Sequence, residues 1–366
     1  MGPAVTGPGF QYQIRNGVTP GILQIEKNRV GDIIPIMRVM ILSRDDVREC
    51  LSMPLAIQAV REAFILYSTG KADVPERISL TVERRQGVSL FMPAYLRENE
   101  ALGMKIVSVF SGNRDLGLPT ISAAVIVLDP VTGFPLAFME GALLTAIRTG
   151  AASGVATELL ARRSARRVAV FGAGIQARTQ LEAVCTVRAV GRVRVYDLDN
   201  DTAGRFARET AASGPPFPDD ISPAASPSEA VREADIIITA TTSEKPVFEH
   251  KDIAPGVHIN AIGSFQPHVR EVPEATVLRS RVFVDSRSAA LREAGDLIIP
   301  LSKGLISESH IRAEIGEVAG GLKPGREVED DITLFKSVGL AVQDVAAARI
   351  ILERAENLGK GLLVDI

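Results

Sequence analysis

The sequence predicts an α/β protein in which a doubly wound parallel sheet of the Rossmann type is joined to a second α+β domain. Between residues 168 and 284, short apolar runs alternate with helical segments, which is typical of a parallel sheet covered by helices. Between residues 78 and 139, apolar runs follow one another with Gly, Pro and Asn turns between them, which indicates a separate sheet. The 366 residues, 46% of them hydrophobic, suffice for two filled cores.

Composition excludes several classes of protein. The net charge is −3 and the basic residues are scattered along the chain, so we expect no nucleic-acid partner. No apolar run approaches the roughly 18 residues that a membrane span needs, so we expect no membrane association. The two cysteines, Cys50 and Cys185, lie far apart without metal-ligand spacing. We therefore expect no metal site and a reduced, cytoplasmic protein.

The chain divides into three predicted parts. Residues 1–36 are rich in Gly and Pro and lack periodicity, so we expect a flexible N-terminal extension, or else an arm that covers a neighbouring subunit. Residues 37–142 together with 313–366 are expected to form the second domain. Residues 143–312 are expected to form the Rossmann domain.

The second domain begins with two predicted helices. Ser43 and Asp46 form a capping box that starts a short helix. Pro54 stands at the start of the next helix and Gly70 just past its end. Strands are then predicted at Ile78–Val82, Lys105–Phe110, Ala123–Leu128 and Pro135–Met139.

The Rossmann domain starts with an Ala-rich helix over Leu143–Ala161. Its later predicted elements are the strands Val168–Phe171, Val193–Tyr196, Ile236–Ala240, Ile259–Ile262 and Val282–Val284, and the helix Ile175–Val190. Beyond them a long, partly buried helix is predicted over Gly339–Leu358. We expect this last helix to return to the second domain, because a sheet already filled with strands has little use for it.

A phosphate-binding turn is predicted between Val168 and Ala177, where a strand ends and a helix begins. Gly172 allows the tight turn, and Gly174 lets a pyrophosphate approach the backbone. Ala177, at the third glycine position, still permits close packing of helix and sheet. The exposed N–H groups and the helix dipole favour phosphate. We therefore predict a dinucleotide site, the alternative being a tight turn without a ligand.

An acidic residue, Asp197, ends the next strand about 20 residues beyond this turn. A carboxylate there can accept hydrogen bonds from the ribose hydroxyls and would repel a 2′-phosphate, which favours NAD over NADP. Arg192 and Arg194 on the same strand leave NADP open, because they could lie near a phosphate. The alternative for Asp197 is an ordinary turn carboxylate.

With these features in place, the chain resembles the ornithine cyclodeaminase/mu-crystallin family from Met40 to Gly361. That family includes ornithine cyclodeaminase, archaeal-type alanine dehydrogenase, ketimine and pyrroline-carboxylate reductases, a hydroxyproline dehydratase and crystallins. The resemblance implies a homodimer and gives the second domain a dimerisation and substrate-binding role. The segments that carry it are Phe91–Ala94, Gly103–Lys105, Gly117–Thr120, Leu144–Ala152, Gly172–Ala177, Asn260–Gly263 and Ile332–Gly339.

The resemblance also implies a substrate site. Arg77 and Lys105 resemble the basic pair that holds the substrate, and Met92 is expected beside them. A substrate carboxylate needs a guanidinium fork or an ammonium group, which suits this pair. Lys105, the expected catalytic residue, could also polarise a carbonyl or imine, or move a proton if burial lowered its pKa. The alternative for Lys105 is a solvated edge-strand lysine.

Cofactor contacts are implied by the same resemblance. The expected set is Thr120, Arg148, Gly172, Gly174, Ile175, Gln176, Asp197, Thr241, Asn260, Ile262 and Ser337. Arg148 lies in an Ala-rich segment, where a buried arginine would be costly without a partner. A cofactor phosphate would supply one, and the alternative is an internal salt bridge with a glutamate such as Glu140.

One segment departs from the ornithine cyclodeaminase pattern. After Gly263, that enzyme carries an aspartate that handles the protons of the substrate amine, and Phe265 stands in its place here. His268 is the nearest titratable side chain and could act as an acid, although a loop histidine is more often a surface residue. Glu271 is another acid that could reach the same space.

The predicted function is that of an NAD(P)-dependent oxidoreductase acting on a small amino or imino acid. A cyclic imine such as pyrroline-2-carboxylate, or an oxo acid with ammonia, would suit such a site. The first alternative is a lyase of the ornithine cyclodeaminase or hydroxyproline dehydratase type. The second is a crystallin-like NAD(P)-binding protein with little turnover.

Overall fold

The computed structural model describes residues 23–27 and 33–366, with side chains from Arg38 onward. Much of the predicted flexible extension therefore lies outside the described residues. Its described part differs from the prediction, because β1 (Leu23–Lys27) pairs antiparallel with β2 (Ile33–Leu42). The apolar, β-branched run of β2 favours a strand over an irregular segment.

The second domain is built on a nine-stranded sheet in the order β1-β2-β8-β7-β6-β5-β3, with β17 paired to β2 and β4 to β5. Most neighbours are antiparallel, whereas β2 and β8 are parallel. Met92 on β5 and Val125 on β7 flank Lys105 on β6. The remaining strands of this sheet are β3 (Ala72–Asp73), β4 (Ile78–Val82), β5 (Gly87–Leu96), β6 (Ala101–Phe110), β7 (Ile121–Leu128), β8 (Pro135–Glu140) and β17 (Leu362–Asp365).

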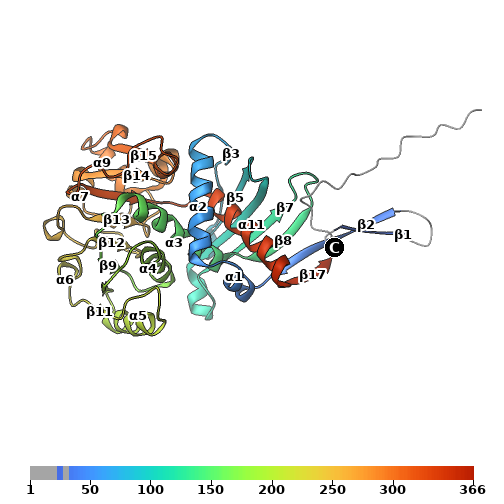
Figure 1. Ribbon diagram of the computed structural model, residues 1–366, viewed down its shortest axis with the longest axis horizontal. Coiled ribbons are helices and arrows are strands. Elements are labelled where there is room, and N and C mark those ends of the chain that lie inside the picture. The colour runs from blue at the N-terminus through green and yellow to red at the C-terminus, as the bar shows by residue number, and fades with distance from the viewer. Residues whose placement is uncertain (1–22, 28–32) are drawn as a thin grey trace, which may run out of the picture.

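Helices cover one face of this sheet, and they are α1 (Arg44–Cys50), α2 (Met53–Ser68) and α11 (Ala341–Leu358) (Figure 1). The predicted capping box is confirmed, since the Ser43 hydroxyl accepts from the Asp46 N–H and the Asp46 carboxylate accepts from the Ser43 N–H. Helix α11 packs against α2, β5 and β6, which confirms the predicted return of the chain to this domain.

The predicted doubly wound sheet is confirmed as eight parallel strands in the order β11-β10-β9-β12-β13-β16-β14-β15. The predicted boundary after residue 312 is wrong for this sheet, because β16 pairs with both β13 and β14. Its strands are β9 (Arg167–Phe171), β10 (Arg192–Tyr196), β11 (Ile221–Pro223), β12 (Ile236–Thr239), β13 (His258–Ala261), β14 (Ser280–Val284), β15 (Ile311–Glu314) and β16 (Ile332–Lys336).

Helix α3 (Gly141–Leu160) connects the two halves, and it is largely buried between α2 and α4 (Figure 1). A Cβ added at Gly150 would lie 2.4 Å from the backbone oxygen of Thr179, so the small residues of α3 permit this close packing. The other helices are α4 (Ile175–Val187), α5 (Asn200–Ala212), α6 (Pro227–Val231), α7 (Glu274–Arg279), α8 (Arg287–Glu293), α9 (Gly295–Ser302) and α10 (Ile315–Ala319). Short 3-10 turns occur at Glu83–Arg85, Ser111–Leu116, His250–Asp252 and Glu308–His310.

Within residues 23–27 and 33–366, no single helix is both long enough and apolar enough to cross a membrane. The consecutive helices α1 and α2 meet the length and composition criteria only as a pair, and the chain bends by 83° between them.

Candidate active site

The Gly-rich turn joins β9 to α4 at the carboxyl edge of the parallel sheet. Gly172 has φ +91°, and a Cβ there would lie 2.5 Å from the backbone oxygen of Ala240. Gly174, by contrast, has open space around its Cβ position and precedes the first turn of α4 without any side-chain cap. The N–H groups at the start of α4 therefore face space that a phosphate can occupy.

Asp197 lies directly against this turn. Its carboxylate accepts hydrogen bonds from the N–H groups of Ala173 (3.0 Å) and Asp199 (3.1 Å), which hold it at the end of β10. Arg192 and Arg194, which could have bound the 2′-phosphate of NADP, each pair with an acid of the protein. Arg192 contacts Glu233, and Arg194 donates to Asp220 at 2.7 Å.

A buried polar atom without a partner in the first turn of α4 also favours a bound dinucleotide. The side-chain oxygen of Gln176, in the first turn of α4, is buried without a hydrogen-bond partner. A buried amide oxygen without a partner is costly, so a bound donor would stabilise it. Ile175 beside it is largely exposed and offers apolar surface at the mouth of the site. Gly172, Gly174, Ile175, Gln176 and Asp197 are thus arranged as a dinucleotide site requires.

We expect Asp197→Ser to weaken the preference for NAD(H) over NADP(H). The wild-type protein should bind NADH more tightly, because the carboxylate accepts ribose hydroxyls and repels a 2′-phosphate. Calorimetric titration of both proteins with NADH and NADPH measures the two dissociation constants. Asp220→Ser is the matched control, because it also replaces an aspartate with serine but removes the partner of Arg194 instead of the acid at the turn. Tighter NADPH binding by the unmodified protein would contradict the expectation.

Three predicted cofactor residues have their side chains bound to the protein instead. Asn260 is fully buried, donates to the Thr157 hydroxyl at 2.9 Å and lies 3.1 Å from the His258 ring nitrogen. The hydroxyl of Ser337 donates to Asp285 at 2.7 Å. The side chains of Asn260 and Ser337 thus have internal partners, as buried polar groups generally do, and their contacts to a cofactor stay predictions.

Thr241 is the third of these residues, and Glu271 accounts for it. The Thr241 hydroxyl and N–H both donate to the Glu271 carboxylate, at 2.6 and 2.7 Å. The same carboxylate accepts from Thr239, Gly263 and Ser264. Burial raises the pKa of Glu271. Glu271 therefore joins the loops after β12 and β13, and it is not the free acid that the sequence left open.

The positions of two further predicted cofactor residues, Thr120 and Ile262, neither support nor contradict contact with a cofactor. Thr120 lies between the 3-10 turn and β7 in the nine-stranded sheet, where its carbonyl accepts from the Phe110 N–H at 2.8 Å. Ile262 follows β13 and packs, partly buried, against the main core. Their contacts to a cofactor stay predictions.

Lys105 is buried in the sheet rather than solvated. Its side chain is 2% exposed, and its Nζ lies 2.8 Å from the carboxylate of Asp344 in the first turn of α11. Burial and the nearby Arg148 guanidinium lower the pKa of Lys105 to about 7, although Asp344 opposes this shift. An amine with such a pKa can be protonated or neutral near pH 7, as proton transfer requires.

Arg148 shares the same carboxylate. Its Nε donates to Asp344 and its Nη1 donates to Gln343, both at 2.8 Å. The structure thus supplies an internal partner for this buried arginine, as the alternative proposed, but that partner is Asp344. Glu140 instead caps α3, accepting from the N–H groups of Ala142 and Leu143. The prediction of Arg148 as a phosphate ligand is therefore not needed to explain its burial.

Arg77 reaches the same place from the loop before β4. Its Nη2 donates to the carbonyl of Gly339 at 2.7 Å, and its Nε lies 3.4 Å from Glu293. Gly339 has φ +83°, and a Cβ there would lie 2.9 Å from Arg148 Nη1. The segment after β16 thus runs between two guanidinium groups, with Asp285 accepting the N–H of Gly339 at 2.7 Å.

A cavity of about 150 Å³ opens between the two halves of the molecule at this point. It is lined by Arg77 and Met92 from one half and by Ser286, Ser288, Ala289 and Glu293 from the other. The Tyr67 hydroxyl lies 2.7 Å from that of Ser286 at its wall. Burial raises the pKa of Glu293, with Arg77 opposing this shift. The predicted substrate residues Arg77, Met92 and Lys105 therefore lie together, since Lys105 pairs with Met92 in the sheet.

Sequence reasoning missed the acids of this site. Asp344 and Asp285 are both fully buried. Asp344 stands on an otherwise apolar helix face with Ala341, Val345 and Ala348, which is an uncommon place for a carboxylate without a partner. Asp285 directly follows the strand Ser280–Val284, as Asp197 follows β10. Both signals were available in the sequence.

The loop that departs from the cyclodeaminase pattern is exposed. Phe265 is 49% exposed, and His268 is exposed beside it. Val269 is buried, and its carbonyl accepts the Ser264 hydroxyl at 2.8 Å. Within the described residues, this loop contributes no side chain to the lining of the cavity, and its acid, Glu271, is bound to the loops around it.

A dinucleotide turn on a parallel sheet, beside a cationic cavity shared with a second sheet, is the arrangement that the resemblance implies. The chain belongs to the ornithine cyclodeaminase/mu-crystallin family, whose model matches residues 37–359.

Individual relatives of this chain are reductases and a dehydrogenase. The Δ¹-pyrroline-2-carboxylate reductase of Bacillus cereus is 40% identical over 328 residues, covering 89% of this chain and all of that protein. The Δ¹-pyrroline-2-carboxylate reductase of Thermococcus litoralis, solved in complex with NADH and L-proline, is 44% identical with a TM-score of 0.85, covering 88% of this chain and 99% of that one. An archaeal alanine dehydrogenase dimer with bound NAD is 38% identical with a TM-score of 0.84, covering 90% and 100%.

Proposed function

We propose that the chain is an NAD(P)-dependent oxidoreductase of a small amino or imino acid, and specifically a reductase of a cyclic imine such as pyrroline-2-carboxylate. One observation carries the proposal. The two buried cations Lys105 and Arg148 share the single carboxylate of Asp344, and Arg77 lies close enough to lower the pKa of Lys105. Buried positive charge in excess of its partners favours an anion, and the substrate carboxylate is that anion.

Each residue of the site has a role in the proposed reaction. Arg77 and Arg148 bind the substrate carboxylate, because guanidinium groups bind carboxylates through paired hydrogen bonds. Lys105, with its pKa of about 7, protonates the nitrogen of the imine. Asp344 keeps Lys105 and Arg148 in place. NAD(P)H, when bound at the Gly172–Gln176 turn, supplies the hydride.

The lyase alternative lacks a residue that it needs. Cyclodeamination of ornithine requires a positioned carboxylate near the substrate amines, and Phe265 stands where that acid is expected. The other acid on this loop, Glu271, accepts five hydrogen bonds from the loops around it. A reductase requires only a hydride donor, a group that binds the substrate carboxylate and a donor of one proton.

We expect NAD(P)H oxidation with pyrroline-2-carboxylate and no cyclisation of ornithine. The first assay follows NADH and NADPH absorbance with a panel of cyclic imines and of oxo acids plus ammonia. The second incubates the enzyme with ornithine and catalytic NAD and measures proline and ammonia. Efficient proline formation from ornithine, with no NAD(P)H oxidation on any imine or oxo acid, would replace the reductase with the lyase. Tight NADH binding without turnover on any substrate would favour the crystallin-like alternative.

A homodimer is part of the same proposal. Apolar side chains of the nine-stranded sheet are exposed on several strands, namely Ile78 and Leu80 on β4, Ile121 on β7 and Phe138 on β8. An apolar sheet surface of this kind favours association with a second copy. We expect light scattering to give twice the mass of the chain at micromolar concentration, and a monomer would contradict this.

We also propose a cytoplasmic location. Cys50 and Cys185 are free and buried, as expected for a chain kept in a reducing compartment. Burial raises the pKa of Cys185 to about 12, so its thiol is poorly reactive.

A further inference from the structure

A basic pocket of about 510 Å³ lies at the amino ends of β9, β10 and β12. The Gly172–Gln176 turn is at the carboxyl ends of the same sheet, so the two sites are on opposite edges. The pocket is lined by Arg162, Ser164, Arg166, Arg167, Arg192 and Asp235. No apolar side chain contributes to this lining.

The chain concentrates charge in the connection between α3 and β9, which reads Arg162-Arg163-Ser164-Ala165-Arg166-Arg167. Pairing of β9 with β10 then places Arg192 opposite Arg167. The expectation that basic residues are scattered is therefore wrong at this place. Local sequence supplies four of the arginines, and the parallel sheet adds the fifth.

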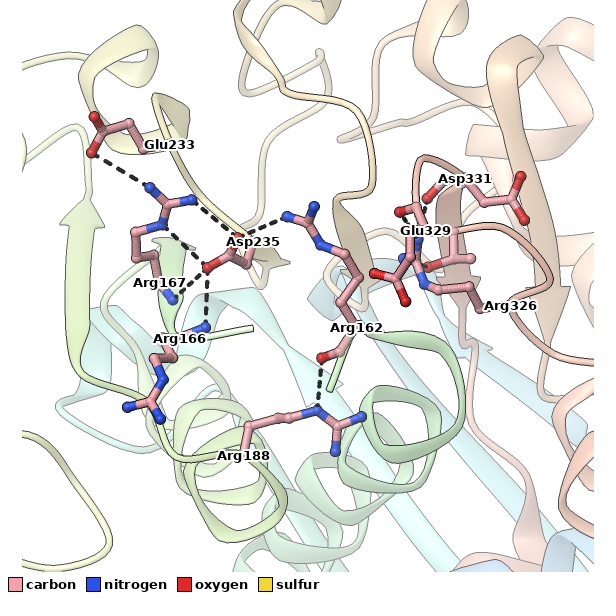
Figure 2. Close-up of polar contacts among 10 residues, drawn as sticks. Arg162, Arg166, Arg167, Arg188, Glu233, Asp235, Arg326, Glu329 and Asp331 are labelled. Atoms are coloured by element: carbon pink, nitrogen blue, oxygen red, sulfur yellow. Dashed lines mark hydrogen bonds and ion pairs between the residues drawn. The ribbon is translucent and has the colours of Figure 1, made fainter. Parts of the chain in front are cut away.

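Asp235 holds this connection in one conformation. Its carboxylate accepts from Arg162 at 2.9 Å, from the Arg167 guanidinium at 3.2 Å, and from the N–H groups of Arg166 and Arg167 at 3.0 Å each. Figure 2 shows Asp235 between the side chains of Arg162 and Arg167. The guanidinium groups of Arg162 and Arg167 are therefore positioned before any ligand arrives, which lowers the entropy cost of binding.

The pocket has more positively charged side chains than acids to pair with them. Asp235 and Glu233 are the two acids that pair with three of its four lining arginines, namely Arg162, Arg167 and Arg192. The Nε of Arg162 is buried without a partner. The exposed guanidinium of Arg166 has no hydrogen bond or ion pair within the described part of the chain, and Figure 2 shows it directed away from Asp235.

Two more arginines, Arg188 and Arg326, bind carbonyl groups near the pocket. Arg188 donates to the carbonyls of Thr157, Glu158 and Ala161 and to that of Arg162, as part of Figure 2 shows. Arg326 binds the carbonyl of Leu160 and other carbonyls around it. Because both guanidinium groups bind carbonyl oxygens, their charge adds to the positive potential without a carboxylate in hydrogen-bond contact.

We propose that this pocket binds a small polyphosphate anion at a site separate from the dinucleotide turn. Guanidinium groups bind phosphate oxygens through paired hydrogen bonds, and several groups around one open pocket suit an anion with more than one phosphate. The lining consists of arginines, a serine, a glycine and an aspartate, so the phosphates are the recognised part of the ligand.

The test titrates inorganic pyrophosphate into the full-length protein saturated with NADH, by calorimetry at low and at physiological ionic strength. Saturation with NADH keeps pyrophosphate off the Gly172–Gln176 turn. Arg166→Gln removes a guanidinium without an internal partner, so the fold should persist. Arg163→Gln removes the same charge from the same connection but outside the pocket lining, and is the matched control.

We expect one pyrophosphate per chain with NADH bound, weakened about tenfold or more in Arg166→Gln because a charge-assisted contact is lost. Arg163→Gln should stay within about threefold, since an exposed charge outside the pocket lining is screened. The absence of binding, or equal weakening in both variants, would overturn the proposal. Binding only without NADH would assign the ion to the dinucleotide turn. Tighter binding of a DNA duplex than of pyrophosphate, with the same loss in Arg166→Gln, would assign the pocket to nucleic acid.

Discussion

Replacing Lys105 with alanine is expected to lower turnover on pyrroline-2-carboxylate on the order of 10²-fold or more, while NADH binding stays nearly unchanged. Lys105 lies beside Met92, which lines the cavity between the two halves, whereas the Gly172–Gln176 turn lies on the other sheet. Loss of a charged contact in a closed site removes several kcal/mol of transition-state stabilisation. Steady-state kinetics and calorimetric NADH titration of the same preparations measure the two effects.

Lys105→Arg is the matched variant, because it keeps a cation but removes a group that can release a proton near pH 7. It should bind substrate better than Lys105→Ala and still turn over slowly. An alanine variant that keeps most of its activity, with unchanged thermal stability, would return Lys105 to a purely structural role.

The pH profile of the wild-type enzyme follows from the same residue. The pKa of Lys105 is about 7, because burial and Arg148 favour the neutral amine. Reduction needs the protonated amine, so kcat/KM for the imine should fall as pH rises through about 7. Oxidation of the product amino acid needs the neutral amine, so its kcat/KM should rise through the same pH. Profiles that move in the same direction for both reactions would exclude Lys105 as the proton carrier.

Asp344→Ala is expected to destabilise the fold by about 3–5 kcal/mol, because it leaves Lys105 and Arg148 as buried cations without their shared carboxylate. Urea denaturation followed by circular dichroism measures the free energy of unfolding. The remaining folded enzyme should also show a lower pKa for Lys105, since Asp344 is a partner that raises it.

Asp365→Ala provides the comparison for this variant. Asp365 pairs with Arg38 at 2.9 Å, but its side chain is 62% exposed. An exposed pair of this kind contributes at most about 1 kcal/mol. If both variants lose the same stability, the buried carboxylate is not the counter-charge on which the site depends.

Local pattern was sufficient for most of the elements. The capping box at Ser43, the helix after Pro54 and the strand before Gly172 each depend on residues within a few positions of one another. The eight-stranded sheet was predictable as a class, because alternating strands and helices have few ways to pack. Its strand order was not, since the placement of β16 between β13 and β14 depends on a long crossover.

The candidate site divides in the same way. The dinucleotide turn was readable, because Gly172, Gly174 and the strand around them are contiguous and Asp197 ends the next strand. Family resemblance brought Arg77, Met92 and Lys105 to one site. It placed Asn260, Ser337 and Thr241 at the cofactor, where the structure gives their side chains internal partners.

By itself, then, the sequence determined the fold class and the phosphate-binding turn, because these depend on short-range periodicity and on contiguous motifs. The residue types for substrate binding came from the family resemblance of the sequence. Only the tertiary structure decided which carboxylate serves which cation. Arg148 is 196 residues from Asp344 in the chain, and Ser337 is 52 residues from Asp285. Ion pairs form between groups that packing brings within about 4 Å, and no local pattern records that distance. The same packing placed Arg192 beside the connection before β9 and so built the basic pocket.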